Sequence, residues 1–508
     1  MGPFKLISLK IGKENTENES KIQEYIFSTV ANGNRQSPFI SLIIGANATG
    51  KTRLLRLITE IFNDLYIYKN AEGTKIFPNE NFILIYKIGI DEYNIEGSTS
   101  TGFIIKCNQK SINKENLDLP SNLVCLSHSI TDRFPQGHNF TNLRQRSKYD
   151  NEFYHYLGAR TFNNMASSTG HITRALDLLA NAFSKNTFNH KMPEIFKLLD
   201  LHPIIRVQFR KGFTLAGKLG NKRITKVDLK REINNLDERK TGFSYNKFQK
   251  LLIEDVHLEE AVDYYNQLLA FQNSKRDYEF EINFKNPSVQ SSFFNNYKAI
   301  STLRKLNLIR YGEIQVIRRN GKIFNINHGS SGEIQIFTSF LSLSSVITER
   351  SLVLIDEPEI SLHPNWQMEY IDLINSVFKH LFESHFIISS HSHFLASDLP
   401  PKTSSLISFK KDDNGEVISE LQPEKTFGWS AEQILLEIFN MPTTRNLFVY
   451  KTVGEILNIN SKPKKSKKDI ESIVFRVKKL QSFNIDELDE RDPLKEIIDK
   501  LIKKYGKK

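Results

Sequence analysis

Cysteine is scarce in this sequence, and long apolar runs are missing. The 508 residues include two cysteines, Cys107 and Cys125. Two are too few for a disulfide framework, so we expect both to lie reduced inside a cytoplasmic protein. No stretch approaches the ~18 consecutive apolar residues of a transmembrane helix, and the first residues lack the apolar segment of a secretory signal. The sequence therefore predicts neither a membrane partner nor export.

What the sequence does contain is the composition of a soluble globular protein. Hydrophobic residues make up 39% and charged residues 25% of the chain, which is long enough for roughly two to four domains. The net charge is +11. A protein that binds nucleic acid would carry such a charge, but a lysine-rich composition gives the same value without that partner. Both interpretations stay open.

The most informative segment is a glycine-rich turn between an apolar run and an amphipathic stretch. The pattern G-x-x-x-x-G-K-[ST] is matched by Gly45, Ala46, Asn47, Ala48, Thr49, Gly50, Lys51 and Thr52. The run 39–44 before it predicts a strand, and residues 54–62 after it predict a helix. In this setting backbone amides point at phosphate oxygens, Lys51 reaches the β- and γ-phosphates, and Thr52 places its hydroxyl on Mg²⁺. The segment predicts a nucleotide site.

Two adjacent carboxylates follow a second apolar run. Residues 351–355 lead directly into Asp356 and Glu357. A buried parallel strand has this composition, and sheets of this kind carry functional groups where their strands end. We expect Asp356 to hold Mg²⁺, directly or through water, and Glu357 to polarise the water that attacks the γ-phosphate. Without the glycine-rich loop upstream, an ordinary strand ending in an acidic turn would look the same.

A third apolar strand is predicted just before His391, about thirty residues later. Because parallel strands end at the same edge of a sheet, we expect His391 to lie near Asp356, where it would contact the γ-phosphate or orient the attacking water. The alternative is a metal site built from His385, His391 and His393. No cysteine or carboxylate at the spacing of zinc ligands completes that site.

Small residues open a further predicted helix. They are Ser330, Ser331, Gly332 and Glu333, and they precede the apolar stretch 334–343. A helix start of this kind can bind an anion, although a plain loop with an N-cap gives the same pattern. The position of this helix before the acidic strand favours the anion site.

The order of these motifs resembles that of ATP-binding-cassette (ABC) ATPases, in the soluble branch that holds RecF, SMC-type and OLD-type proteins. Residues 356–364 are similar to their Walker B and D-loop motif DEPExxLHP, and residues 330–333 to a shortened signature. Residues 390–392 resemble their T-H-S histidine switch, with Ser in place of Thr. The resemblance implies an α/β fold: an ABC-ATPase head with a phosphate-binding loop and a central mixed or parallel sheet flanked by helices.

The resemblance also implies a mechanism that needs more than one copy of the chain. Two heads pair head to tail, and each donates its signature, including Ser330, to the ATP held by the other. Ser361 and His363 of the D-loop run across that interface. ATP and Mg²⁺ are the implied cofactors, ATP hydrolysis is the implied reaction, and a homo-oligomer is the implied assembly. The family's Q-loop glutamine is not evident, although residues 127–135 occupy its place.

Periodicity and motif order together predict four segments. We expect residues 1–170 to form the first half of the ATPase core, 171–299 a helical insertion, 300–449 the second half of the core, and 450–508 a basic helical C-terminal extension. Helical periodicity within the insertion is clearest at 172–183, 227–236 and 248–273. Five lysines at 462–468 would bind the phosphates of nucleic acid or form a basic linker.

In length, in motif order and in residues 427–439, the chain is similar to the ATPase subunit of Septu antiphage systems, which also occurs beside certain retrons. That likeness implies a prokaryotic defence complex in which the ATPase controls a partner, either an HNH nuclease or another effector. Three alternatives stay open. They are a RecF- or SMC-like DNA-repair ATPase acting directly on DNA, the ATPase scaffold of a PARIS-type complex with a Toprim effector, and a scaffold that binds ATP without appreciable turnover.

Overall fold

The computed structural model describes most of the chain in two compact units, Met1–Gly428 and Trp429–Lys508. The described residues are 2–12, 23–28, 37–71, 76–129, 131–136, 148–149, 151–158, 168–184, 192–212, 219, 222–234, 258–272, 278–285, 296–412, 415–423, 426–439, 441, 446–461, 466–482 and 493–505. Within this part of the chain no helix is long and apolar enough to cross a membrane.

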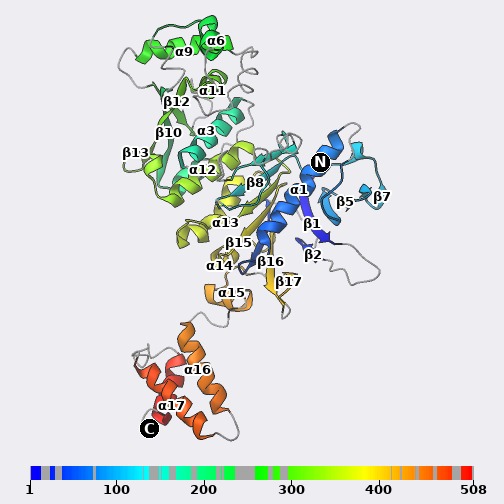
Figure 1. The fold of residues 1–508 in the computed structure, drawn as a ribbon, viewed down its shortest axis with the longest axis vertical. Coiled ribbons are helices and arrows are strands. Elements are labelled where there is room, and N and C mark those ends of the chain that lie inside the picture. Colours follow the sequence, from blue (N-terminus) through cyan, green and yellow to red (C-terminus); the bar gives the residue numbers. More distant parts are fainter. Residues whose placement is uncertain are drawn as a thin grey trace. The chain divides into compact units, whose positions relative to one another are not determined.

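A seven-stranded sheet is the centre of the first unit (Figure 1). Its order is β17-β16-β3-β15-β14-β8-β9, with every neighbouring pair parallel except β16 and β17. The strands are β3 (Phe39–Gly45), β8 (Leu123–Ser127), β9 (Tyr154–Tyr156), β14 (Leu352–Asp356), β15 (His385–Ser390), β16 (Ser404–Lys411) and β17 (Val417–Leu421). Because β3, β8, β14 and β15 are buried along their whole length, their sequences are near-continuous apolar runs. The predicted α/β fold with a central, mostly parallel sheet is confirmed.

A second, antiparallel sheet covers one side of this core. Its order is β2-β1-β4-β5-β6-β7, and its strands are β1 (Phe4–Ile11), β2 (Gln23–Ile26), β4 (Phe82–Ile88), β5 (Asp91–Ser98), β6 (Gly102–Cys107) and β7 (Lys110–Ser111), followed by the short helix η1 (Lys114–Asn116). Helix α1 (Lys51–Asn70) lies between the two sheets: Leu54 and Phe62 share one apolar cluster with Phe4 of β1 and Leu352 of β14. The helix that follows the glycine-rich loop is therefore held on both faces.

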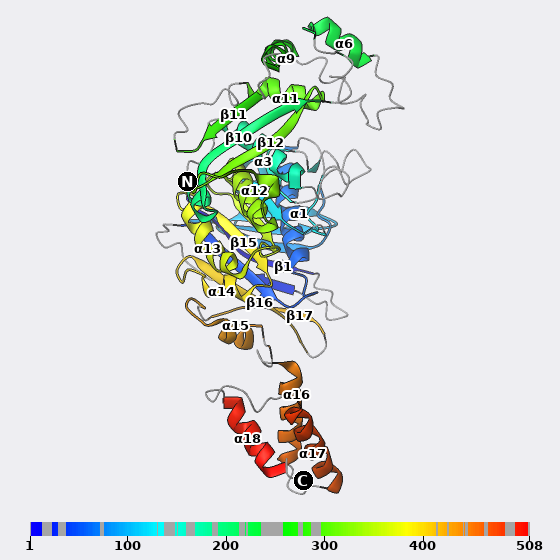
Figure 2. The same ribbon diagram turned by 90° about the vertical axis from the view of Figure 1, so that its left-hand side faces the viewer.

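The other face of the central sheet is covered by α12 (Ser331–Val346) and α13 (Pro364–Phe378). Phe340 of α12 stacks on Phe378 of α13 with ring centroids 6.0 Å apart, and Phe378 contacts Phe386 of β15 at 5.6 Å. In Figure 1 α1 and α12 lie on opposite sides of the strands, and in Figure 2 the side that carries α12 faces the viewer. Helix α14 (His393–Ser397) follows β15 directly.

His385 joins the two sheets. It is fully buried, its Nδ1 accepts a hydrogen bond from the Leu6 amide at 3.0 Å, and its Nε2 lies 2.9 Å from the Ser41 hydroxyl. Because Nδ1 is an acceptor, Nε2 carries the proton and donates it to Ser41, which in turn donates to the Phe27 carbonyl at 3.1 Å. Both ring nitrogens are therefore used in structural hydrogen bonds.

Between β9 and α12 the described residues form helices and also a third sheet. The helices are α3 (Ser168–Ser184), α4 (Pro193–Leu198), α6 (Lys226–Asn234), α9 (Leu258–Gln272) and α11 (Tyr297–Lys305). The antiparallel sheet has the order β11-β10-β12-β13, from β10 (Leu201–Lys211), β11 (Tyr278–Asn283), β12 (Ile309–Arg318) and β13 (Ile323–Asn325), and η3 (Ile326–His328) follows it. Helices predicted at 172–183 and 227–236 are found as α3 and α6. The helix predicted at 248–273 is described from Leu258 only, and its first part lies outside the described residues.

Strands β10 and β11 are an addition to the helices that the sequence predicted for this region. Along β10 the residues alternate between buried and partly exposed, with Ile205, Val207 and Phe209 facing inward. A search for helical periodicity does not detect this alternation, because helix and strand differ in period. The region 171–299 is therefore mixed rather than helical throughout.

The second unit is helical. It contains α15 (Ala431–Glu437), α16 (Leu447–Asn460), α17 (Lys467–Gln481) and α18 (Pro493–Tyr505). Helices α16 to α18 bury a small core of their own, made of Val453, Ile456, Ile473, Val477, Leu480, Ile498, Leu501 and Tyr505. The lysine-rich run lies partly outside the described residues, and its last two lysines begin α17 behind a capping box at Ser466. The four-segment division proposed from the sequence stays a prediction.

Candidate nucleotide-binding site

Three strand ends meet at one edge of the central sheet. Strand β15 lies between β3 and β14 and pairs in parallel with both, so that Ser389 is opposite Ile43 on one side and Asp356 on the other. The glycine-rich loop follows β3, Glu357 follows β14, and His391 follows β15. The predicted meeting of these segments at one edge is confirmed. That the histidine strand separates the other two could not be predicted from the sequence.

The loop after β3 needs its glycines. A Cβ on Gly45 would lie 2.5 Å from the Phe409 carbonyl oxygen of β16, and Gly50, just before α1, has a φ of +86°. Lys51 is buried and curls back over the loop, where its Nζ donates to the carbonyls of Gly45 at 2.9 Å and Ala46 at 3.1 Å. The loop therefore forms a tight cradle closed by its own lysine.

Burial leaves the Lys51 ammonium short of counter-charge. Desolvation lowers the pKa of Lys51 to about 8, and the carboxylates of Glu357, Glu359 and Asp356 offset only part of this effect. A phosphate group in the loop would supply the missing negative charge at hydrogen-bonding distance. The site is thus electrostatically prepared for an anion.

Asp356 and Thr52 bring the acidic strand and the glycine-rich loop into direct contact. The Thr52 hydroxyl donates to Asp356 Oδ1 at 3.2 Å, and the Ser389 hydroxyl donates to the same oxygen. Asp356 is 1% exposed, and burial raises its pKa to about 6. A hydroxyl and a carboxylate side by side are the hard oxygen donors that Mg²⁺ prefers, so these two residues fit the metal predicted for them.

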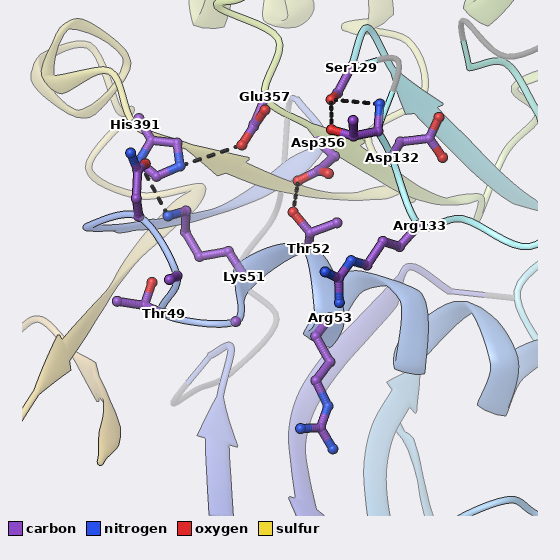
Figure 3. Close-up of a pocket in the computed structure, with 14 residues that line it drawn as sticks. Thr49, Lys51, Thr52, Arg53, Ser129, Asp132, Arg133, Asp356, Glu357 and His391 are labelled. Atoms are coloured by element: carbon purple, nitrogen blue, oxygen red, sulfur yellow. Dashed lines mark hydrogen bonds and ion pairs between the residues drawn. The ribbon is translucent and has the colours of Figure 1, made fainter. Parts of the chain in front are cut away.

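Glu357 and His391 face each other across the loop (Figure 3). His391 Nε2 lies 3.4 Å from Glu357 Oε1, and His391 Nδ1 lies 3.4 Å from the Lys51 Nζ. Burial and then the charge of Lys51 lower the pKa of His391, so the ring is neutral; Nδ1 accepts from the ammonium and the Nε2 proton points at Glu357. Glu357 has a φ of +51°, a conformation that costs a non-glycine residue energy and that is typical of functional sites.

Glu359 holds His391 from behind, a role that the sequence analysis missed. Its Oε1 accepts the His391 backbone N–H at 2.5 Å, and burial raises the pKa of this carboxyl. The sequence shows that Glu359 is the third residue after Asp356, but it does not indicate that this side chain turns toward β15. The contact links the end of the acidic strand to the histidine segment.

Lys51, Thr52, Asp356, Glu357 and His391 all line a pocket of about 500 Å³ (Figure 3). The pocket is lined by Asn47, Ala48, Thr49, Gly50, Lys51, Thr52, Arg53, Ser129, Thr131, Asp132, Arg133, Asp356, Glu357 and His391. Among these, Arg53 and the four residues at 129–133 were not assigned a role from the sequence. The segment 127–135 was placed here only as the equivalent of the Q-loop, and no single residue in it could be selected.

The signature-like residues form a second cluster. Ser330 is the N-cap of α12, where its hydroxyl accepts from the Glu333 amide at 3.2 Å while Glu333 Oε2 accepts from the Ser330 amide at 2.8 Å. Ser361 has a φ of +64°, and an added Cβ on Gly332 would lie 2.9 Å from its carbonyl oxygen. The signature-like turn and the D-loop therefore pack against each other.

The two clusters are separate within one chain. His363 is the N-cap of α13, and its Nδ1 accepts from the Asn365 amide at 3.3 Å. Within the described part of the chain, the pocket lining contains none of the residues predicted to act from the second cluster, namely Ser330, Ser331, Gly332, Glu333, Ser361 and His363. Their predicted contact with nucleotide stays a prediction that requires another copy of the chain.

Comparisons with known proteins give a family match and short matches to curated relatives. Residues 32–396 match a family model described as an AAA ATPase domain. The Septu protein PtuA of Bacillus thuringiensis is 28% identical over 107 residues, which are 20% of this chain and 26% of that protein. Protein ea59 of Escherichia phage lambda is 25% identical over 163 residues, 30% of each chain. The matched segments thus span less than a third of these curated relatives.

Two solved structures align over most of the chain at low similarity. The Smc head domain bound to the C-terminal domain of ScpA, from Pyrococcus furiosus, covers 82% of this chain and 96% of its own, at 14% identity and a TM-score of 0.32. The recombination mediator protein RecF covers 82% and 98%, at 14% identity and a TM-score of 0.28.

The raised pKa of Asp356 predicts that this residue destabilises the metal-free fold at neutral pH. A carboxyl whose folded pKa is raised to about 6 contributes stability below its unfolded value, and this contribution is lost as the pH rises through the folded pKa. Asp356→Asn should therefore raise the free energy of unfolding at pH 8 by about 3 kcal/mol. The gain should shrink through pH 6 and vanish below about pH 4.

Urea titration in EDTA, at several pH values, measures this difference. The control is Asp228→Asn. Hydrogen bonds from Thr225 lower the pKa of the partly exposed Asp228, so its loss should destabilise the protein at pH 8 rather than stabilise it. Equal stability of Asp356→Asn and wild type at pH 8 would show that burying the charged Asp356 carboxylate does not destabilise the fold.

The contact of Gly332 with the D-loop predicts that this turn tolerates no side chain. Gly332→Ala places a methyl group 2.9 Å from both the Ser361 carbonyl oxygen and the Trp366 ring. We expect a loss of about 1–3 kcal/mol in thermal or urea unfolding. Gly454→Ala is the control, because an added Cβ there meets nothing within 4 Å and α16 should gain from the replacement. If Gly332→Ala is as stable as wild type, the described packing between the signature-like turn and the D-loop is wrong.

Proposed function

This chain belongs to the AAA ATPase domain family, and we propose that it binds ATP with Mg²⁺ in the described pocket and hydrolyses it there. The observation that carries the proposal is the hydrogen bond between Thr52 and Asp356. It joins the two motifs that a nucleotide hydrolase needs at one point, with Glu357 and His391 beside it. A pocket of about 500 Å³ is large enough for a nucleotide.

Six residues of the site have roles in this proposal. Lys51 exchanges the carbonyls of its own loop for the β- and γ-phosphates, and Thr52 and Asp356 hold the metal. Mg²⁺, when bound, would neutralise charge on the phosphate oxygens. Glu357 orients and polarises the attacking water, and neutral His391 holds the Glu357 carboxylate through Nε2–H. Glu359 fixes His391 through its backbone.

The proposed assembly follows from the separation of the two clusters. Ser330 and its neighbours stand at the start of α12 with the D-loop packed beside them, outside the pocket of their own chain. A second copy in head-to-tail contact would bring this cluster over the nucleotide. We therefore expect a homo-oligomer whose smallest unit is a dimer, formed or tightened when ATP binds.

The proposed setting is antiphage defence. The similarity to the Septu protein PtuA supports an ATPase subunit that controls a separate effector, with an HNH nuclease as the first candidate. The net charge of +11 supports the competing function, an ATPase that acts directly on DNA. A Toprim effector in place of the nuclease would leave the ATPase chemistry unchanged.

Two substitutions separate ATP binding from turnover. Lys51→Ala should weaken ATP binding by about 100-fold or more, because it removes the buried cation under the phosphates. Glu357→Gln should retain ATP affinity within about threefold but lower the hydrolysis rate by about 100-fold or more, since an amide cannot polarise water. Calorimetry measures binding, and phosphate release measures turnover.

Matched controls come from the same part of the molecule. Lys69→Ala changes a lysine in the last turn of α1, and Glu369→Gln changes an exposed glutamate of α13. Both should behave as wild type. Wild-type turnover in Glu357→Gln would remove Glu357 from its proposed role. An oligomer that Glu357→Gln accumulates in ATP, seen by size-exclusion chromatography, supports the composite site.

The defence proposal is tested by the product of the neighbouring gene. Co-expressed, the two proteins should elute as one complex, and cells carrying both genes should resist phage only with Lys51 intact. The outcome that contradicts this is a neighbour without nuclease or other effector motifs that forms no complex. Tight, ATP-dependent binding of duplex DNA by the chain alone, with an affinity that falls steeply as the salt concentration rises, would favour the DNA-repair function instead.

A further inference from the structure

Three cationic side chains line the pocket, and two of them already have partners. Lys51 bonds to the carbonyls of its own loop, and Arg53 forms an ion pair with Glu80 at 3.4 Å. Arg133 is exposed at the pocket wall and makes no hydrogen bond or ion pair with any other described residue. Figure 3 shows its side chain on the same side of the pocket as Thr52 and Arg53, across from Lys51 and His391.

The residues on either side of Arg133 are fixed by buried hydrogen bonds. Asp132 Oδ1 accepts from the Phe134 amide at 3.0 Å, and Asp132 Oδ2 accepts from the Tyr156 hydroxyl at 2.7 Å. The Pro135 carbonyl accepts from the Tyr154 hydroxyl at 2.7 Å. Asp132, Phe134 and Pro135 are buried, whereas Arg133 is exposed. The loop therefore has a fixed backbone from which one long cationic side chain extends into the pocket.

The neighbouring carboxylate does not neutralise this arginine. Both oxygens of Asp132 accept hydrogen bonds from other groups, and Figure 3 shows its carboxylate turned away from the Arg133 side chain. An unpaired guanidinium presents five N–H donors in a planar fork, which matches the oxygens of a phosphate. Held opposite a phosphate-binding loop, it can grip a polyphosphate from the side that Lys51 does not reach.

We propose that Arg133 is a binding residue for the phosphate chain of the nucleotide. This inference rests on the proposed function, because it needs ATP in this pocket. Arg133 contacts non-bridging phosphate oxygens on the Thr52 side, and Lys51 contacts them from the other. Arg133 lies in residues 127–135, the segment that corresponds to the Q-loop but contains no glutamine. In this proposal a phosphate-binding arginine therefore replaces a glutamine that would contact the metal.

Tyr156 positions Arg133 through Asp132. The Tyr156 hydroxyl holds Asp132, the Tyr156 carbonyl accepts from Arg174, and the Arg174 guanidinium lies 5.4 Å from the centre of the Tyr156 ring. Arg174 belongs to α3, the first helix of the segment inserted between the two halves of the core. The orientation of the phosphate-binding arginine thus depends on a helix outside the pocket.

The direct test is nucleotide affinity in four proteins. Arg133→Ala should bind ATP about tenfold more weakly than wild type, and Arg133→Lys should fall between them, because lysine keeps the charge but loses the fork. Arg210→Ala is the matched control: it removes an exposed arginine of β10 that pairs with Glu313 at 3.2 Å, and it should bind as wild type. The affinity for inorganic tripolyphosphate, used as a competitor, should fall in Arg133→Ala by the same factor as the affinity for ATP.

A double-mutant cycle tests the positioning role. Tyr156→Phe alone should weaken the binding of ATP and of tripolyphosphate by a smaller factor than Arg133→Ala does. It should have no further effect on binding when Arg133 is already alanine. A purely structural role of the Tyr156 hydroxyl would weaken binding equally in both backgrounds. Thermal unfolding of Arg133→Ala without nucleotide should match wild type, because the side chain is exposed.

The outcomes separate this inference from the function beneath it. If Arg133→Ala binds ATP as tightly as wild type, or loses ATP affinity but not tripolyphosphate affinity, Arg133 does not bind phosphate. If wild type and Lys51→Ala bind ATP equally or not at all, the proposed function itself fails.

Discussion

The parallel pairing of β15 with both β3 and β14 is the constraint on which the site depends. It sets Ser389 level with Ile43 and Asp356, and thereby brings three chemically different segments to one edge of the sheet. A slip of two residues in either pair would move Asp356 by roughly 6–7 Å, beyond reach of the Thr52 hydroxyl. The apolar contacts of α1 on one face and of α13 on the other hold this register, so the packing of the core and the geometry of the pocket are one requirement.

Charges of both signs are buried at this edge, and each is poorly compensated by itself. The pKa of Lys51 is lowered and that of Asp356 is raised, in both cases chiefly because burial penalises the charged form. Phosphate beside the lysine and magnesium beside the carboxylate would relieve both penalties together. The same desolvation that weakens the empty fold therefore strengthens the binding of a charged ligand, which is the usual trade between stability and function at such sites.

The sequence predicted the elements whose signal is local. A glycine-rich loop between strand and helix, and carboxylates at the end of an apolar run, depend on a few adjacent residues, so Lys51, Thr52 and Asp356 could be placed correctly at one edge. Contacts between distant segments could not be predicted in this way. The Glu359 carboxylate accepts from the backbone of His391, and β10 alternates between buried and partly exposed residues in a region predicted to be helical. Both features depend on contacts with residues distant in the sequence. The division into four segments stays a prediction.

The arrangement of the second cluster bears on how ATP can act at a distance. Gly332 and Ser361 leave no room between them, so a nucleotide that pressed on the signature-like turn of another copy would also move its D-loop. On the opposite wall, the loop that carries Arg133 is tied through Tyr156 to Arg174 of α3. The signature-like turn of a second copy and the loop that carries Arg133 are thus each linked to an element outside the pocket, namely the D-loop and α3. Phosphates bound between them can shift an equilibrium elsewhere only by binding one arrangement of these walls more tightly than another. In the proposed dimer one wall would come from a second copy, while the wall that carries Arg133 is tied to α3, and such a pocket meets that condition. A closed pocket within one rigid core would not.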